Sequence, residues 1–336
     1  MDIVERIRAK LYREAKYLGR ELSYALGFNR HFYRNARGSR ILIYHGICRN
    51  DHTRFNPIFL TQEIFESHLK LYRKYFNVVS LDDFYAQRFS NDRFNICITF
   101  DDGFANNHRY VLPLLAKYSL PATFFITAIR DAGYDVLWND FLGIVSKYGP
   151  ASLTYKDERY CKDRYKKYCS VKTGERLSDQ LRATGFAEKA AMMDTLYPLV
   201  PFRKNFREKD YWLQMTTTEI RELAASPFVD IGAHGYYHND LSRLNITEAL
   251  DEMDKSKQFL ENVTGKPVRS FAFPYGAYTR ELINTAKVAG YHQLLAMDFS
   301  FAEDAGDPAL RERFTVNPFI TPINQMYATI TRRYER

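Results

Sequence analysis

One apolar segment that runs directly into two adjacent aspartates most restricts how this chain can fold. Residues 95–103 read NICITFDDG, which is typical of a strand buried on both faces, followed by a turn. Two carboxylates at the end of such a strand are costly to bury, and they resist ionising together unless a cation neutralises one of them. The pattern therefore predicts a divalent cation held by one aspartate, with the other free as a base. The alternative is a strand end followed by an aspartate helix cap.

Apolar strand patterns and amphipathic helix patterns alternate on both sides of this segment. We expect strands at residues 40–47, 78–80, 121–127, 228–233, 270–273 and 292–297, and helices at residues 61–75, 81–87, 107–118, 217–225, 247–263 and 279–289. This alternation favours an α/β fold with a parallel sheet. Residues 138–215 break the alternation and carry little strand pattern. We interpret them as a partly helical insertion in a main domain that spans residues 39–336.

The positive charge of the chain is concentrated in its first residues. The net charge is +8, of which residues 1–40 carry +6. Residues 2–26 have the spacing of an amphipathic helix, with Ile3, Ile7, Leu11 and Leu22 on one side. We expect residues 1–38 to form a basic extension. Its helix could pack on the main domain, or it could lie on an anionic membrane surface through residues 1–30.

Several classes of protein do not fit the sequence. No nucleic-acid-binding module accompanies the basic segment, so we expect no nucleic acid partner. The four cysteines show no CxxC spacing, which favours reduced thiols. The sequence contains neither a long apolar run nor an apolar signal core. We therefore expect a cytoplasmic protein, peripheral at the inner face of the membrane.

Two more motifs come at the ends of expected strands. His234 and His238 follow the strand at residues 228–233, and histidines four residues apart can reach one metal ion. Pairs with this spacing are also common on protein surfaces. The sequence FPYG at residues 273–276 follows another strand, and its backbone N–H groups could receive an oxyanion, although a β-turn with a core tyrosine is the alternative. Because the carboxyl ends of parallel strands meet at one edge, we expect these motifs to form one site.

Taken in order, TFDDG at residues 99–103, HxxxHxxLS at 234–242 and FPYG at 273–276 resemble the polysaccharide deacetylases of the NodB-homology group, carbohydrate esterase family 4. The resemblance implies a distorted (β/α) barrel of about seven parallel strands. It also implies a bound divalent metal, with Zn²⁺ expected and Co²⁺, Ni²⁺ or Mn²⁺ as alternatives.

The resemblance also assigns roles to single residues. Asp101 matches the general base, and Tyr275 matches the residue whose backbone N–H binds the oxyanion, within a substrate-binding turn formed with Pro274 and Gly276. The metal ligands that the resemblance implies are Asp102, His234 and His238.

The sequence departs from the family pattern in three places. Ala272 stands where the family often has an arginine that orients the base, and Gly235 stands where Ser or Thr is usual. No LxxH motif follows residue 276 to supply the histidine that acts as the general acid, and His292 does not fit one. In permuted members of the family this histidine lies on an early strand. We therefore expect His45 to be the acid, the alternative being a strand-end histidine with a backbone partner.

From these motifs we expect a metal-dependent hydrolase that removes an N-acetyl group from an amino sugar of a polysaccharide or a lipid-linked glycan precursor. The departures motivate one alternative, a catalytically impaired protein that binds glycans on the same fold. A deformylase or amidase acting on a related lipid-linked sugar would also fit the motifs, and so would an amidase acting on a small non-sugar amide.

Overall fold

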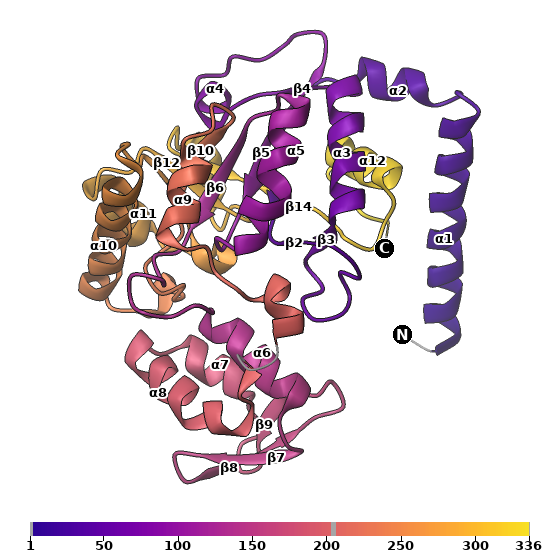
Figure 1. Ribbon diagram of the computed structural model, residues 1–336. Coiled ribbons are helices and arrows are strands. Elements are labelled where there is room, and N and C mark those ends of the chain that lie inside the picture. Colours follow the sequence, from indigo (N-terminus) through magenta and orange to yellow (C-terminus); the bar gives the residue numbers. More distant parts are fainter. Residues whose placement is uncertain (1–2, 203–205, 336) are drawn as a thin grey trace.

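Eight parallel strands form a nearly closed barrel in the computed structural model, which describes residues 3–202 and 206–335 (Figure 1). Their order around the barrel is β13-β12-β11-β10-β6-β5-β1-β14, and a further strand, β4, pairs with β5. The strands are β1 (Ser39–Tyr44), β4 (Phe76–Val78), β5 (Phe94–Phe100), β6 (Ala122–Ile126), β10 (Val229–Ala233), β11 (Ser270–Ala272), β12 (Gln293–Ala296), β13 (Leu310–Glu312) and β14 (Phe314–Thr315). The expected α/β barrel is confirmed.

The barrel is closed by one extended segment that changes its partner. Strand β13 pairs with β12 and strand β14 pairs with β1, both in parallel, and Arg313 alone separates β13 from β14. The Arg313 N–H donates to the Met297 carbonyl at 3.1 Å, and the Val316 N–H donates to the Ile43 carbonyl at 3.1 Å. The first strand therefore lies beside the last, and Arg313 lies at the junction.

Helices follow most of the strands, as the sequence predicts. They are α3 (Gln62–Tyr75), α4 (Leu81–Tyr85), α5 (Leu112–Tyr118) after a π-helical turn η1 (Asn107–Val111), α9 (Thr217–Ala224), α10 (Ile246–Thr264), α11 (Arg280–Val288) and α12 (Pro322–Thr331). Thr61 caps α3, and Thr216 and Glu219 form a capping box at α9, so local side chains fix where these helices begin. Two short strands, β2 (Ile47–Cys48) and β3 (Leu60–Thr61), pair outside the barrel.

The expected insertion forms a separate lobe, which lies below the barrel in Figure 1. It contains α6 (Trp138–Tyr148), β7 (Ser152–Tyr155), β8 (Glu158–Lys162), β9 (Tyr168–Ser170), α7 (Leu177–Arg182), α8 (Phe186–Leu196), η2 (Tyr197–Leu199) and η4 (Phe206–Tyr211). Its own apolar core includes Trp138, Leu153 and Met192. Residues 203–205 of the expected insertion lie outside the described residues.

The expectation of little strand structure in this lobe is wrong, because β7, β8 and β9 form an antiparallel sheet. The strands are only three to five residues long, and charged residues crowd them. Tyr160 and Tyr168 are buried while neighbouring lysines and arginines are not, so single tyrosines replace the usual alternation of aliphatic residues.

The N-terminal helix α1 (Ile3–Ala25) lies at the outer edge of the molecule, and α2 (Arg30–Asn35) joins it to β1 (Figure 1). The expected helix start at Asp2 lies outside the described residues. Polar contacts hold α1 to the barrel: Arg20 donates to Asn324 at 2.7 Å and pairs with Glu335 at 2.7 Å. The Tyr24 hydroxyl lies 2.9 Å from that of Tyr75.

The apolar side chains of α1 point away from these contacts. Five of them recur at helical spacing with 51–64% of their surface exposed, and we call them the outer stripe: Val4, Ile7, Leu11, Leu18 and Leu22. Within the described residues, every helix is too short or too polar to cross a membrane.

Candidate active site

The register of the barrel brings the sequence motifs to one edge. Tyr44 pairs with Phe100, so His45 and Asp101 leave neighbouring strands at the same level. Ile126 pairs with Ala233, so His234 leaves β10 at the level of Thr127. The three motifs and His45 therefore meet at the carboxyl ends of the strands, where parallel α/β folds build their sites.

The turn after β5 depends on an unusual backbone. Asp102 has φ 77° and Gly103 has φ 83°, and both values lie in the left-handed region. A Cβ atom at residue 103 would lie 2.8 Å from the Ile126 Cγ2 atom, so the position requires glycine for two independent reasons. Asp is among the few other residues that tolerate this conformation. The turn gives the two aspartates different partners.

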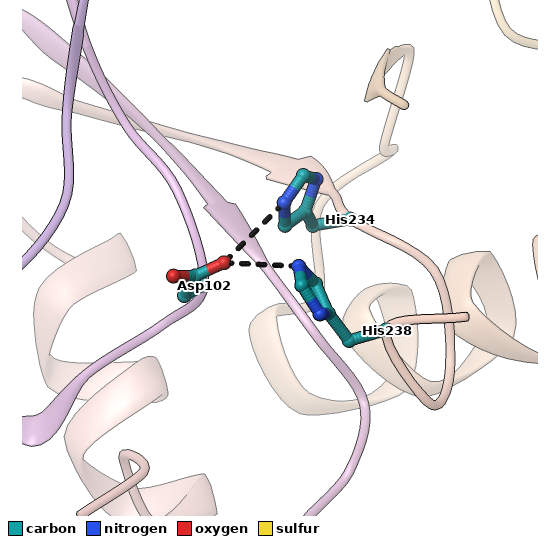
Figure 2. A group of neighbouring side chains, drawn as sticks. All are labelled: Asp102, His234 and His238. Carbon is teal, nitrogen blue, oxygen red and sulfur yellow. Dashed lines mark ion pairs between the residues drawn. The ribbon is translucent and has the colours of Figure 1, made fainter. Parts of the chain in front are cut away.

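Asp102, His234 and His238 form a compact buried group (Figure 2). The Oδ1 atom of Asp102 lies 3.5 Å from Nε2 of His234 and 3.2 Å from Nε2 of His238. Two ligand atoms held about 2.1 Å from a tetrahedral Zn²⁺ ion lie about 3.4 Å apart, so this spacing fits one ion with an open fourth position. Each of the three residues is at most 6% exposed.

The pKa shifts of Asp102 and His238 suit a metal ligand, whereas that of His234 does not: burial lowers the pKa of His234, but Asp101 and Asp102 outweigh burial and raise it. Burial opposes the charge of Asp102, but hydrogen bonds from the two imidazoles hold its pKa well below the usual range, so it stays an acceptor. Burial lowers the pKa of His238, which favours the neutral imidazole that binds metals. Nδ1 of His234 lies 2.7 Å from the Ala272 carbonyl and donates to it, which leaves Nε2 as the ligand atom.

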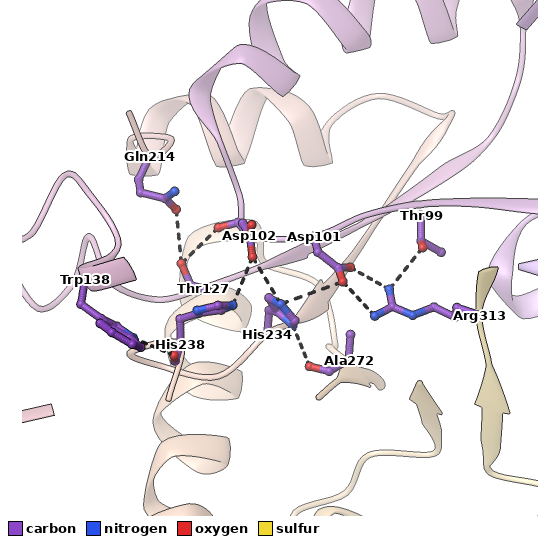
Figure 3. Close-up of polar contacts among 10 residues, drawn as sticks. All are labelled: Thr99, Asp101, Asp102, Thr127, Trp138, Gln214, His234, His238, Ala272 and Arg313. Carbon is purple, nitrogen blue, oxygen red and sulfur yellow. Dashed lines mark hydrogen bonds and ion pairs between the residues drawn. The ribbon is translucent and has the colours of Figure 1, made fainter. Parts of the chain in front are cut away.

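Asp101 has a different partner, which the sequence motifs did not identify (Figure 3). Both of its carboxylate oxygens accept hydrogen bonds from Arg313, at 2.7 and 2.8 Å, and the Arg313 side chain is 1% exposed. The arginine missing at Ala272 is thus supplied by the segment that closes the barrel. Arg311 and Arg313 lie two residues apart in the sequence LRERF, so the alternation of side chains along a strand would place them on one face and does not tell them apart.

This ion pair decides the charge of Asp101. Burial raises the pKa of its carboxyl group, but the charge of Arg313, followed by that of His234, outweighs burial and holds the pKa below its ordinary value. Asp101 is therefore ionised at neutral pH. Its carboxylate lies 4.0 Å from Nε2 of His234, beside the metal-ligand group without being part of it.

His45 lies at the same edge as the two aspartates and is half-buried. It lies close enough to lower the pKa of both Asp101 and Asp102 whenever its ring is protonated. In the part of the chain that the structure describes, its ring makes no hydrogen bond, so the backbone partner of the alternative interpretation is not found there. Its side chain is available to a substrate.

The FPYG turn lies beside the metal-ligand group. Tyr275 has φ 61° within the short turn η6 (Pro274–Gly276), and its ring centre is 4.9 Å from that of His238. Pro274 is buried, and a Cβ atom at Gly276 would approach Met297 to 2.5 Å, so the backbone of this turn is fixed by packing. The structure thus brings Tyr275 beside the expected ligands.

Comparison with known proteins agrees with this arrangement. The profile of the polysaccharide deacetylase family matches residues 90–148 and 179–294, just over half of the chain. The chain therefore belongs to the polysaccharide deacetylase family, as the three motifs suggested, and the family implies a carbohydrate substrate. The unmatched residues 149–178 contain the β7–β9 sheet. No curated protein matches the sequence significantly.

Solved structures share the fold at low sequence identity. The deacetylase PplD of Streptococcus pyogenes, solved with acetate, is 15% identical with a TM-score of 0.55, over 87% of this chain and 97% of that one. A polysaccharide deacetylase of Bacillus cereus is 18% identical with a TM-score of 0.53, over 87% of this chain and 68% of that one. IcaB of Ammonifex degensii is 17% identical with a TM-score of 0.51, over 88% and 98%.

The Asp101–Arg313 pair leads to a prediction about pH. In Arg313→Met, burial of Asp101 is no longer opposed by the guanidinium, so the pKa of Asp101 should rise and the acid limb of kcat/KM should move to higher pH. A rise of one unit lowers the rate on that limb about tenfold. The control is Arg311→Met, on the same segment but stacked on Tyr85 instead of paired with Asp101. Identical acid limbs in the wild type and Arg313→Met would contradict the assignment.

Proposed function

We propose that this protein is a metal-dependent deacetylase that hydrolyses an N-acetyl group on an amino sugar. The observation that carries the proposal is that two adjacent aspartates have different partners and are suited to different roles. Asp102 joins two histidines in a group suited to a metal, while Asp101 remains an ionised carboxylate 4.0 Å from one of those histidines. A protein that only binds glycans has no use for a free base beside a metal.

These positions support the following bond changes. When bound, Zn²⁺ or a similar ion would act as a Lewis acid toward the amide carbonyl and the attacking water. Asp101 takes a proton from the water as the water oxygen adds to the carbonyl carbon. The backbone N–H of Tyr275 donates to the oxyanion that develops. His45 gives a proton to the sugar nitrogen as the C–N bond breaks, and the products are acetate and a free amine.

The substrate class rests on the family and on its solved members. The family implies a carbohydrate, and the S. pyogenes relative was solved with acetate, the product that such a reaction releases. A de-N-acetylase of Aggregatibacter actinomycetemcomitans shares the fold, with a TM-score of 0.50. These relatives support N-deacetylation over deformylation, and over hydrolysis of a small non-sugar amide.

One of the two reasons for considering an impaired glycan-binding protein no longer holds. The absence of an arginine at Ala272 suggested a weakened base, but Arg313 reaches the same carboxylate from the segment that closes the barrel. The second motive, a missing late histidine, depends on the role of His45.

We further propose that the protein works in the cytoplasm, at the inner face of a membrane, on a lipid-linked precursor. The outer stripe of α1 supports this, because its side chains face away from the barrel and basic residues flank them. An exposed apolar stripe with neighbouring arginines and lysines fits the interface of an anionic bilayer.

Two variants should separate the base from the metal ligands. Asp101→Asn should retain metal but lose acetate release by about 10²–10⁴-fold, the usual range for general-base catalysis. His238→Ala should lose most of its bound metal. Metal content by elemental analysis and acetate release from N-acetylglucosamine oligomers and single N-acetyl amino sugars provide the measurements. Near-normal activity in Asp101→Asn, or full metal content in His238→Ala, would overturn the assignment.

A general acid should matter only when the leaving group needs a proton. His45→Ala should lower kcat on an N-acetyl amino sugar about 10²-fold. It should hydrolyse 4-nitrophenyl acetate nearly as fast as the wild type, because that leaving group departs without protonation. Metal content should not change. Equal losses on both substrates would mean that His45 shapes the site without donating the proton.

Binding of α1 to a membrane can be tested with single exposed positions. The wild type should sediment with phosphatidylserine vesicles, and less so at high ionic strength. The double variant Leu11→Glu and Leu18→Glu should lose most of this binding, because it places two charges in the outer stripe. The matched control is Val288→Glu, at an exposed apolar position of α11. Equal sedimentation of the double variant and the wild type would leave α1 as a helix that only packs on the barrel.

A further inference from the structure

The second metal-ligand histidine lies on an irregular loop with an unfavourable backbone. Residues 234–240 follow β10 without regular structure, and His238 has φ 58°. A left-handed backbone at a residue other than glycine is strained and persists only where the surroundings enforce it. Something outside the loop must therefore hold His238 in this conformation.

The ring of His238 also lacks the anchor that His234 has. Nδ1 of His234 donates to the Ala272 carbonyl, which fixes that ring. Nδ1 of His238 is buried without a hydrogen-bond partner among the described residues. The direction of its Nε2 atom therefore depends on the backbone of residues 237–240 and on the rings that touch it.

Four consecutive residues of this loop each contact a different side chain of the insertion. Tyr237 stacks on Phe186 with ring centres 4.1 Å apart, the His238 carbonyl accepts from Trp138 Nε1 at 3.2 Å, Asn239 Oδ1 accepts from Lys189 Nζ, and Asp240 Oδ2 accepts from Arg182 Nε at 2.7 Å. The contact to His238 is visible in Figure 3. The four contacts come from α6, α7 and α8, so three helices of the lobe converge on one loop.

The barrel holds the opposite side of the same loop. Glu252 on α10 accepts from the Asn239 side-chain amide and, at 3.2 Å, from the Tyr237 N–H. Asn239 is therefore bound through its oxygen by the insertion and through its nitrogen by the barrel. Lys189 is 0% exposed, and its ammonium group donates both to Asn239 and to the Thr184 carbonyl at 2.9 Å, so it links the loop to the insertion.

A second route connects the insertion to the same histidine. The guanidinium of Arg182 lies 4.3 Å above the Tyr275 ring, and that ring lies 4.9 Å from the His238 ring. Arg182 is thus connected to His238 in two ways. It binds Asp240, two residues further along the same loop, and it lies on the Tyr275 ring that contacts the His238 ring.

We propose that the insertion positions the metal centre: Trp138, Arg182, Phe186 and Lys189, which we call the insertion clamp, hold residues 237–240 so that Nε2 of His238 meets Asp102 and His234. These are positioning residues, since none of them contacts the metal-ligand atoms. The inference rests on the metal site of the proposed function, but it concerns the affinity and geometry of that site and not the reaction. Partners that orient metal ligands from outside typically contribute 10–100-fold to metal affinity.

Two variants weaken the clamp without removing a ligand. Trp138→Phe keeps an aromatic ring but removes the N–H donor to the His238 carbonyl, and Arg182→Met removes the contacts to Asp240 and Tyr275. The control is Leu153→Ala on β7, which opens a cavity in the core of the same lobe but removes none of the four contacts to residues 237–240. For each full-length protein, the dissociation constant for Zn²⁺ is measured by competition with a chelating dye. The absorption spectrum of the Co²⁺-loaded form reports ligand geometry, and the melting temperature reports stability.

We expect both clamp variants to bind Zn²⁺ about tenfold more weakly or worse, with an altered Co²⁺ spectrum. Leu153→Ala should lower the melting temperature but keep the wild-type metal affinity and spectrum. Unchanged Zn²⁺ affinity in both clamp variants would overturn the inference, and so would an equal loss in Leu153→Ala, which would trace the effect to stability alone. A wild type that binds no Zn²⁺ would overturn the metal site itself and this inference with it.

Discussion

The buried ion pair between Asp101 and Arg313 is the interaction on which the rest of the site depends. Two adjacent carboxylates in an apolar barrel cannot share one neutralising partner without losing their separate roles. Arg313 pairs with Asp101, whereas His234 and His238 pair with Asp102. The left-handed turn at Asp102 and Gly103 makes this separation possible, because it directs neighbouring side chains to different partners.

The sequence predicted those parts of the site that local patterns encode. Asp101 and Asp102 end an unbroken apolar strand, and His234 and His238 follow another, so the parallel register alone brings them together. Arg313 could not be found this way. Its role comes from a change of strand partner between residues 312 and 314, which is a property of barrel closure and leaves no local pattern.

Some strands were not predicted for the same reason, because they leave no clear local pattern in the sequence. The strands of the insertion are short and covered by lysines and arginines, so their alternation is hidden. Strands β13 and β14 are too short to be recognised before their partners are known. The contacts between the insertion and residues 237–240 join segments 50 to 100 residues apart, and no periodicity reports such pairs. Long-range partners, more than local elements, were therefore invisible in the sequence.

The position of Arg313 along the chain has a consequence for how the protein becomes active during synthesis. Arg313 is the last residue of the site to leave the ribosome, after the strands that carry the ligands and the base. A nascent chain that ends at β12 already contains Asp102, His234 and His238, but it lacks the guanidinium that pairs with Asp101. The three proposed metal ligands are thus synthesised before the partner of the proposed base, and Asp101 gains that partner only when the segment that closes the barrel is in place.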